Sequence, residues 1–148
     1  MEEQEIRKDI EKIVEKINNE NLKIATQLIV KRNHKKIEDV METLENIIKI
    51  YEMDKEINQE SSKFYEVGEK LKDIGKKLGI KDLYFIAADF YLLAAKFCEY
   101  SLLKSIYYHC AIDTLKEIGL DVNKKYFFSN EEIDDLRVEI MKDFFDGI

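Results

Sequence analysis

The chain contains no proline, although average usage would place roughly seven in a sequence of this length. A helix interior tolerates proline poorly, because the ring clashes with the preceding turn and the nitrogen has no hydrogen to donate. Apolar residues also recur three or four positions apart along almost the whole chain. The sequence therefore predicts an all-α protein of about six helices, arranged as antiparallel hairpins in a bundle without strands.

The size of the chain is that of one domain. Its mass is 17.6 kDa, with 45% hydrophobic and 37% charged residues, which is typical of a folded protein with a hydrated surface. We predict a single all-helical domain over residues 1–148, with amphipathic helices in 1–58 and the helical core in 61–148. Asn18, Asn19 and Asn21 interrupt the apolar stripe of residues 3–30, which leaves open whether that segment is one helix or two.

The charge balance argues against two classes of partner. A net charge of −7 repels nucleic acids and anionic membrane surfaces. The longest stretch without a formal charge, Ser105–Ile112, is far shorter than the ~18 residues of a membrane span. The basic run Lys31–Lys36 is typical of a solvated loop or the positive end of a helix, with phosphate binding as the alternative. The first residues are acidic and do not show the basic and then apolar pattern of a secretory leader. We therefore expect a cytoplasmic protein with no nucleic-acid and no membrane partner.

Residues 82–99 are predicted to form the central helix. Their charged positions, Asp82, Asp89, Lys96 and Glu99, follow one another at spacings of seven, seven and three, and so define one narrow stripe that we expect to face water. Every other face is apolar, which is typical of a helix buried on nearly all sides.

Capping signals mark several helix ends. Ser61 or Ser62, Asp82 and Ser101 are expected to cap helix starts, and Ser129 with Glu132 has the spacing of a capping box. Gly79 and Gly119, each followed by a large apolar residue, predict Schellman-type ends. The helix over 101–119 is expected to turn these residues inward: Leu102, Leu103, Ile106, Tyr107, Cys110, Ala111, Leu115 and Ile118.

The N-terminal stripe has two possible uses. Ile10, Ile17 and Ile24 are seven residues apart, with Ile6 and Ile13 between them and a polar Asn21. This pattern would suit a short coiled-coil homodimer, or the helices could pack on the rest of the chain.

The residues needed for metal, cofactor or acid–base chemistry are scarce. The five glycines form no phosphate-binding loop, and neither Glu-x-x-His nor His-Glu-x-x-His occurs. Cys98 and Cys110 are expected to be about 10 Å apart along an antiparallel hairpin, too far for a disulfide. A metal site at His109, Cys110 and Cys98 is disfavoured, because adjacent helical residues point about 100° apart. We predict no catalytic residue, no metal and no cofactor.

Residues 71–94 resemble one unit of a tetratricopeptide-type helical hairpin. Leu71, Ile74, Gly75 and Leu78 match the large, large, small and large positions of its first helix, and Ala87, Tyr91 and Ala94 match the small, aromatic and small positions of its second. A shift of 34 residues does not give a clean second repeat. The resemblance implies a helical adaptor core more than a true repeat array.

The resemblance also implies a peptide-binding face. Glu69, Lys72 and Lys76 would line it, and Lys72 and Lys76 could hold an acidic side chain or a C-terminal carboxylate. The alternative is a solvated face on which Glu69 and Asp73 pair with these lysines.

The aromatic residues give the remaining candidates. Tyr84, Tyr100 and Tyr108, near predicted helix ends, could sit on an exposed surface that receives a partner. We predict a non-enzymatic protein–protein interaction or scaffolding module that binds a protein or peptide. The alternative is a small-ligand-binding or enzymatic bundle whose internal pocket is lined by Tyr91, Tyr107 and Cys110.

Overall fold

The computed structural model describes residues 2–32, 37–57, 59–123 and 125–146. Within these ranges the chain forms seven helices and no strand, so the all-α prediction is confirmed with one helix more than expected. The helices are α1 (Glu2–Glu15), α2 (Glu20–Arg32), α3 (Ile37–Glu56), α4 (Ser61–Leu78), α5 (Asp82–Phe97), α6 (Ser101–Glu117) and α7 (Asn130–Asp146). Residues 33–36 of the basic run lie outside the described residues.

The N-terminal segment forms two helices, because the asparagine cluster both ends one and starts the next. α1 stops at Glu15, and the Asn19 side-chain oxygen accepts a hydrogen bond from the Leu22 backbone N–H at 3.1 Å. This is the bond that a residue preceding a helix uses to satisfy one of the unpaired N–H groups of the first turn.

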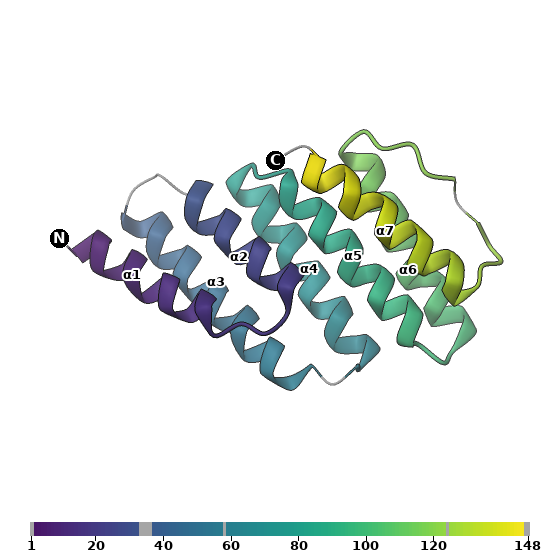
Figure 1. Ribbon diagram of the computed structural model, residues 1–148, viewed down its shortest axis with the longest axis horizontal. Coiled ribbons are helices and arrows are strands. Elements are labelled where there is room, and N and C mark those ends of the chain that lie inside the picture. The colour runs from purple at the N-terminus through teal and green to yellow at the C-terminus, as the bar shows by residue number, and fades with distance from the viewer. Residues whose placement is uncertain (1, 33–36, 58, 124, 147–148) are drawn as a thin grey trace.

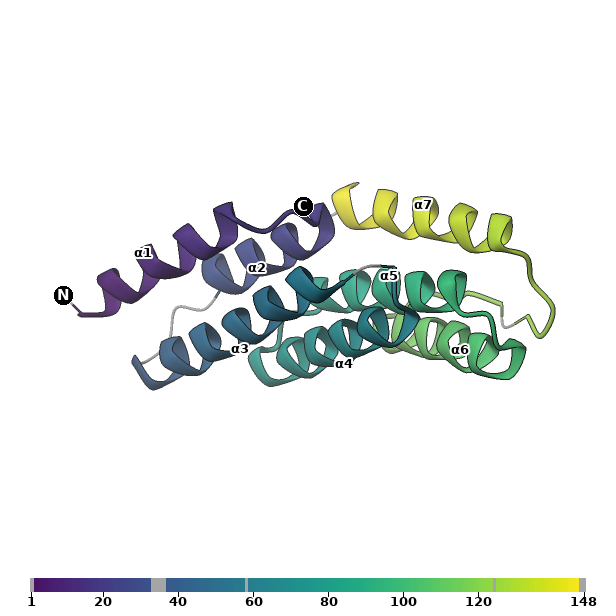
Figure 2. The same cartoon turned by 90° about the horizontal axis from the view of Figure 1, so that it is seen from below.

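α5 lies at the centre of the molecule. It packs against α4, α6, α7 and α2, while α1 packs on α2 and α3, and α3 on α4 (Figure 1). Figure 2 shows α3, α4 and α6 along one side and α1, α2 and α7 along the other, with α5 between α6 and α7. Eleven of the sixteen α5 residues are buried, so the prediction of a central helix is confirmed.

The charged stripe was predicted to face water, and at Asp89 that prediction was wrong, whereas Glu99 is exposed as predicted and Asp82 and Lys96 are partly exposed. Asp89 is fully buried, with 0% of its surface exposed. Arg137 of α7 donates to it at 2.8 Å from Nε and 3.4 Å from Nη2, and the Asn21 amide of α2 donates to its second oxygen. The stripe is instead the seam on which α2 and α7 dock.

The two ends of this seam are also paired. Arg32 of α2 lies 2.8 Å from Asp82, and Lys96 lies 2.9 Å from Asp134 of α7. Each of these α5 charges therefore meets an opposite charge on the helix that covers it. A buried charge is tolerated only when it is paired and hydrogen-bonded in this way.

α6 differs from its predicted orientation at its N-terminal half. Leu102, Leu103 and Ile106 were expected inward, yet they are 77%, 36% and 47% exposed. The reason is the path of the chain, because α7 turns back to cover α5 and leaves the outer side of α6 without a following helix. Tyr107 and Leu115, on the opposite side of α6, are buried as predicted.

The predicted C-terminal stops are confirmed. Gly79 has a φ of 69°, and the Ile80 N–H donates to the Gly75 carbonyl at 2.8 Å. The Leu120 N–H donates in the same way to Leu115 at 3.0 Å. Both are Schellman-type contacts, in which the residue after a left-handed glycine satisfies a helix carbonyl.

The N-terminal caps are confirmed at only one of the predicted places. Ser129 and Glu132 exchange backbone and side-chain hydrogen bonds of 3.2 and 3.4 Å, as a capping box does. Ser61, Asp82 and Ser101 are instead the first residues of their helices, and none of the residues before them makes a side-chain cap.

The N-terminal apolar stripe is used within the chain. Ile10 and Ile17 are 2% and 4% exposed and belong to the core, while Ile6, Ile13 and Ile24 are partly buried against it. Packing on the rest of the chain, one of the two predicted uses, therefore accounts for these residues.

Gly75 marks the closest approach of α4 to the start of α5. A Cβ there would lie 3.0 Å from the Ile80 carbonyl oxygen and 3.1 Å from the Leu83 Cβ, neither of which moves freely. We expect Gly75→Ala to be destabilising, because overpacking costs about 1–3 kcal/mol and outweighs the helix-propensity gain of about 1 kcal/mol. Urea unfolding followed by circular dichroism measures the change, and a variant as stable as the parent would contradict the close approach.

Candidate functional site

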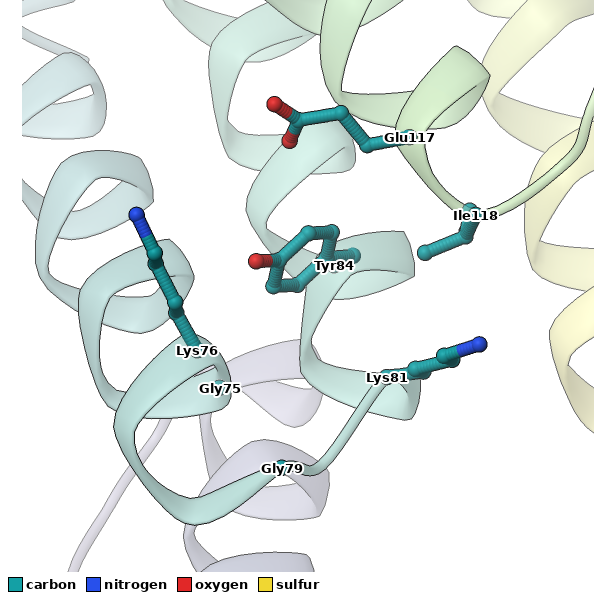
Figure 3. A pocket seen from close by; sticks show the side chains of 7 residues that line it. All are labelled: Gly75, Lys76, Gly79, Lys81, Tyr84, Glu117 and Ile118. Carbon is teal, nitrogen blue, oxygen red and sulfur yellow. The ribbon is translucent and has the colours of Figure 1, made fainter.

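A pocket opens where the end of α4, the start of α5 and the end of α6 meet (Figure 3). It has a volume of about 260 Å³. Its lining residues are Gly75, Lys76, Gly79, Lys81, Tyr84, Glu117 and Ile118. Lys76 precedes the Schellman-type turn at Gly79 and Lys81 follows it. Figure 3 shows the Tyr84 ring between Lys76 and Ile118. We call this the basic pocket.

Two lysines of the basic pocket have no ion-pair partner among the residues that the structure describes. Lys76 and Lys81 are exposed, and in the part of the chain that the structure describes no acidic group lies within 4 Å of either ammonium. The neighbouring Lys77, by contrast, pairs with Glu42 at 3.6 Å and with Asp73 at 3.5 Å. The pocket therefore presents uncompensated positive charge on a protein of net charge −7.

Glu117, which lines the pocket, forms an ion pair with Lys72 of α4. The Lys72 ammonium lies 3.1 Å from the Glu117 carboxylate, which ties α4 to the end of α6. Both groups remain partly exposed, with 30% and 53% of their side-chain surfaces accessible, so the pair itself stabilises the fold little. Its relevance here is that the Glu117 carboxylate already has a lysine partner in Lys72.

The predicted binding residues divide between three places. Lys76 and Tyr84 line the basic pocket, and Lys72 is connected to it only through its ion pair with Glu117. Tyr100 is 77% exposed but precedes α6, about 25 Å from Glu117 at the other end of that helix. Tyr108 is only 5% exposed, because its ring stacks on Phe128 with centroids 4.1 Å apart. Tyr100 and Tyr108 therefore do not contribute to the pocket.

Five lining residues were not predicted as binding residues: Gly75 and Gly79, which were identified only for their places in the helix, and Lys81, Glu117 and Ile118. The stop at Gly79 was visible, and a lysine two residues after it was the available signal for Lys81. Glu117 and Ile118 lie more than thirty residues further along the chain, and no local pattern connects them to α4.

A cluster of tyrosines lies on the same side of α5, farther from the turn. Tyr65 stacks on Tyr107 with centroids 4.9 Å apart and lies 5.6 Å from Tyr91. The Tyr91 hydroxyl donates to Glu69 at 2.6 Å. Glu69 therefore has a hydrogen-bond partner on α5, whereas the solvated-face interpretation of the sequence paired it with a neighbouring lysine.

The chemistry of this cluster is that of a packed core. Burial raises the pKa of the Tyr65, Tyr91 and Tyr107 hydroxyls and of the Cys110 thiol, so all four stay protonated at neutral pH. A protonated thiol is a poor nucleophile. The Tyr65 ring packs against Tyr91 and Tyr107, two of the three residues predicted to line an internal pocket.

Metal ligands do not gather in the described ranges. No group of three or more His, Cys, Asp or Glu side chains in residues 2–32, 37–57, 59–123 and 125–146 is placed to hold an ion. Cys98 is buried and Cys110 half-buried, and both are free thiols, as predicted. His109 is 3.3 Å from the Lys125 carbonyl through Nε2.

None of the helices in the described ranges is both long and apolar enough to cross a membrane. No family of known proteins, no curated protein and no solved structure matches this chain.

Proposed function

We propose that the protein is a non-enzymatic interaction module that holds an acidic segment of a partner protein in the basic pocket. The observation that supports this most directly is the pair of lysines, Lys76 and Lys81, that have no acidic partner beside Tyr84. An acidic side chain or a C-terminal carboxylate would supply the missing negative charge through charge-assisted hydrogen bonds.

The size of the pocket favours a peptide over a free small molecule. Its volume of about 260 Å³ is below the roughly 300–1,000 Å³ of typical small-molecule sites. That volume suits one side chain or a chain terminus, with the rest of the partner lying on the surface. Tyr84 adds an amphipathic ring of the kind enriched at interfaces.

The resemblance of residues 71–94 to a tetratricopeptide-type hairpin supports the same function. Modules of that type take peptides on the face to which Lys72 and Lys76 belong. In this chain Lys72 is paired with Glu117, so Lys81 takes the place of Lys72 as the second lysine available to a carboxylate.

A binding experiment tests the proposal. The probe is a fluorescein-labelled octapeptide with three glutamates before a free C-terminal carboxylate, compared with the same peptide with lysines for glutamates and an amidated end. We expect the acidic peptide alone to bind, and Lys76→Glu with Lys81→Glu to weaken it about tenfold or more, since each charge-assisted bond contributes about 1.5–3 kcal/mol. Fluorescence anisotropy at low and high salt measures the affinity.

The matched control is Lys49→Glu with Lys142→Glu. Both lysines are exposed, on α3 and α7, and the change in net charge is the same. We expect this variant to keep nearly all of the affinity. Equal loss in the two variants would mean that net charge and not the pocket determines binding, and an acidic peptide that does not bind the parent protein would refute the proposal.

A further inference from the structure

The outer side of α6 bears a patch of exposed apolar side chains. Leu102, Leu103 and Ile106 lie on its first two turns, with exposed fractions of 77%, 36% and 47%. Tyr100 immediately precedes the helix and is 77% exposed, and Tyr126 is 75% exposed beside His109, one turn beyond Ile106. We call these five residues the outer α6 patch. Contiguous exposed patches of this kind mark interaction sites.

This patch is exposed because no later helix of the described chain packs on the outer side of α6. α6 packs on α5, and α7 returns to the far side of α5 (Figure 2). The apolar periodicity of α6 nevertheless continues around the helix, so that Leu102 and Ile106 fall on the uncovered side. The apolar pattern of α6 is thus that of a helix that is covered on two sides, whereas within one chain only the side that faces α5 is covered.

We propose that the outer α6 patch is a homodimer interface, on which α6 of a second copy packs. A two-fold dimer brings the same patch of both copies together, so the patch must be complementary to itself. Leu102 and Ile106 are four residues apart and therefore lie on one side of the helix. When two such helices cross antiparallel, Leu102 of each copy meets Ile106 of the other.

The area of the patch is sufficient for a dimer. If the figure of about 200 Å² for an aromatic side chain is taken as the upper limit for all five residues, their exposed fractions correspond to at most roughly 600 Å² on each copy. Two copies that cover the patch completely would bury up to roughly 1,200 Å², which reaches the lower end of stable, specific interfaces.

The charge pattern favours a second copy over a charged partner. Two chains of net charge −7 repel each other, so a face without charged side chains is the one on which association meets the least repulsion. None of the five patch residues carries a charge, and Lys104 beside them bonds Asn130, while the exposed acids Glu99 and Asp113 lie only at the two ends of the patch. The patch is also remote from the basic pocket, which uses the last turn of α6, so this inference does not depend on the proposed peptide binding.

Sedimentation equilibrium of the full chain from about 1 to about 100 µM tests the interface. We expect a reversible dimer whose dissociation constant falls as salt is raised, because salt screens the repulsion between the copies. Leu102→Glu and Ile106→Glu should each raise the dissociation constant about 100-fold or more. Because of the two-fold axis, each substitution introduces two carboxylates into the interface, and each would be buried against an apolar residue of the other copy. Circular dichroism checks that the variants remain folded.

The control is Val138→Glu, which places the same charge on a 70% exposed apolar residue of α7. It should leave the dimer unchanged. A parent protein that is monomeric throughout the concentration range would overturn the proposal. Dimers that survive both α6 substitutions, or that are lost with Val138→Glu alone, would place the interface elsewhere and overturn it as well.

Discussion

Replacing Arg137 by methionine is expected to cost about 3–5 kcal/mol in the free energy of unfolding. Arg137 is the residue of α7 that neutralises Asp89, whose side chain is 0% exposed. Without the guanidinium, a carboxylate remains in the core with only the Asn21 amide as a partner. Removing one member of a buried ion pair is costly for this reason, because the charge left behind has lost both its water and its partner. Urea unfolding at pH 7 gives the change.

The pH dependence of the same variant separates charge from packing. Burial raises the pKa of Asp89 above its ordinary value, while Arg137 and Asn21 act to lower it. Losing Arg137 removes a lowering contribution, so the pKa rises further. A carboxyl group whose pKa is higher in the folded state stabilises at low pH and loses that contribution as the pH rises through the folded-state pKa. The deficit of Arg137→Met should therefore shrink as the pH falls from 7 toward about 4.

The control for this prediction is the double variant Asp89→Leu with Arg137→Met. Replacing both members of a buried ion pair by apolar residues is often neutral or stabilising, so we expect the double variant to recover most of the lost stability. A double variant as unstable as Arg137→Met, with a deficit that does not change with pH, would show that the arginine acts through packing alone.

Phe90→Ala is expected to cost about 3–5 kcal/mol as well. Phe90 lies in the middle of α5, is 0% exposed and has its ring 6.1 Å from that of Phe64 on α4. The cost combines the lost burial of the ring with the cavity left behind, because a close-packed interior relaxes only partly around a vacancy. Thermal and urea unfolding followed by circular dichroism both measure this loss.

The matched control is Phe127→Ala. The side chain of Phe127 is 93% exposed in the connection before α7, so the same chemical change should alter stability by no more than about 0.5 kcal/mol. Similar costs at the two positions would contradict the central place of α5 in the core.

Periodicity and local signals were enough to predict most of the architecture. The apolar run over residues 82–99 identified the central helix, since a segment without a broad polar side must be covered on all sides. Gly79 and Gly119 ended their helices as expected, because both signals depend on residues only a few positions apart. Of the five proposed binding residues, two line one pocket, and a third, Lys72, pairs with Glu117 at its edge.

The residues that were placed wrongly depend on contacts between distant segments. Asp89 was read as solvent-exposed because its partners, Asn21 and Arg137, are 68 and 48 residues away. Leu102 and Ile106 were read as buried because their apolar spacing is that of a covered helix, whereas the return of α7 to α5 leaves them bare. The spacing of apolar residues in a sequence indicates which side of a helix is suited to burial, but it does not indicate which segment of the chain packs there.

The paired charges of α5 and α7 also determine how far along its neighbour the last helix can dock. Asp134 and Arg137 of α7 are one turn apart and meet Lys96 and Asp89. If α7 slid by three residues, about 4.5 Å, Asp134 would take the position of Arg137 and its carboxylate would oppose that of the buried Asp89. Apolar contacts alone would tolerate such a shift along the helix axis. The two ion pairs therefore favour one register of α7 on α5.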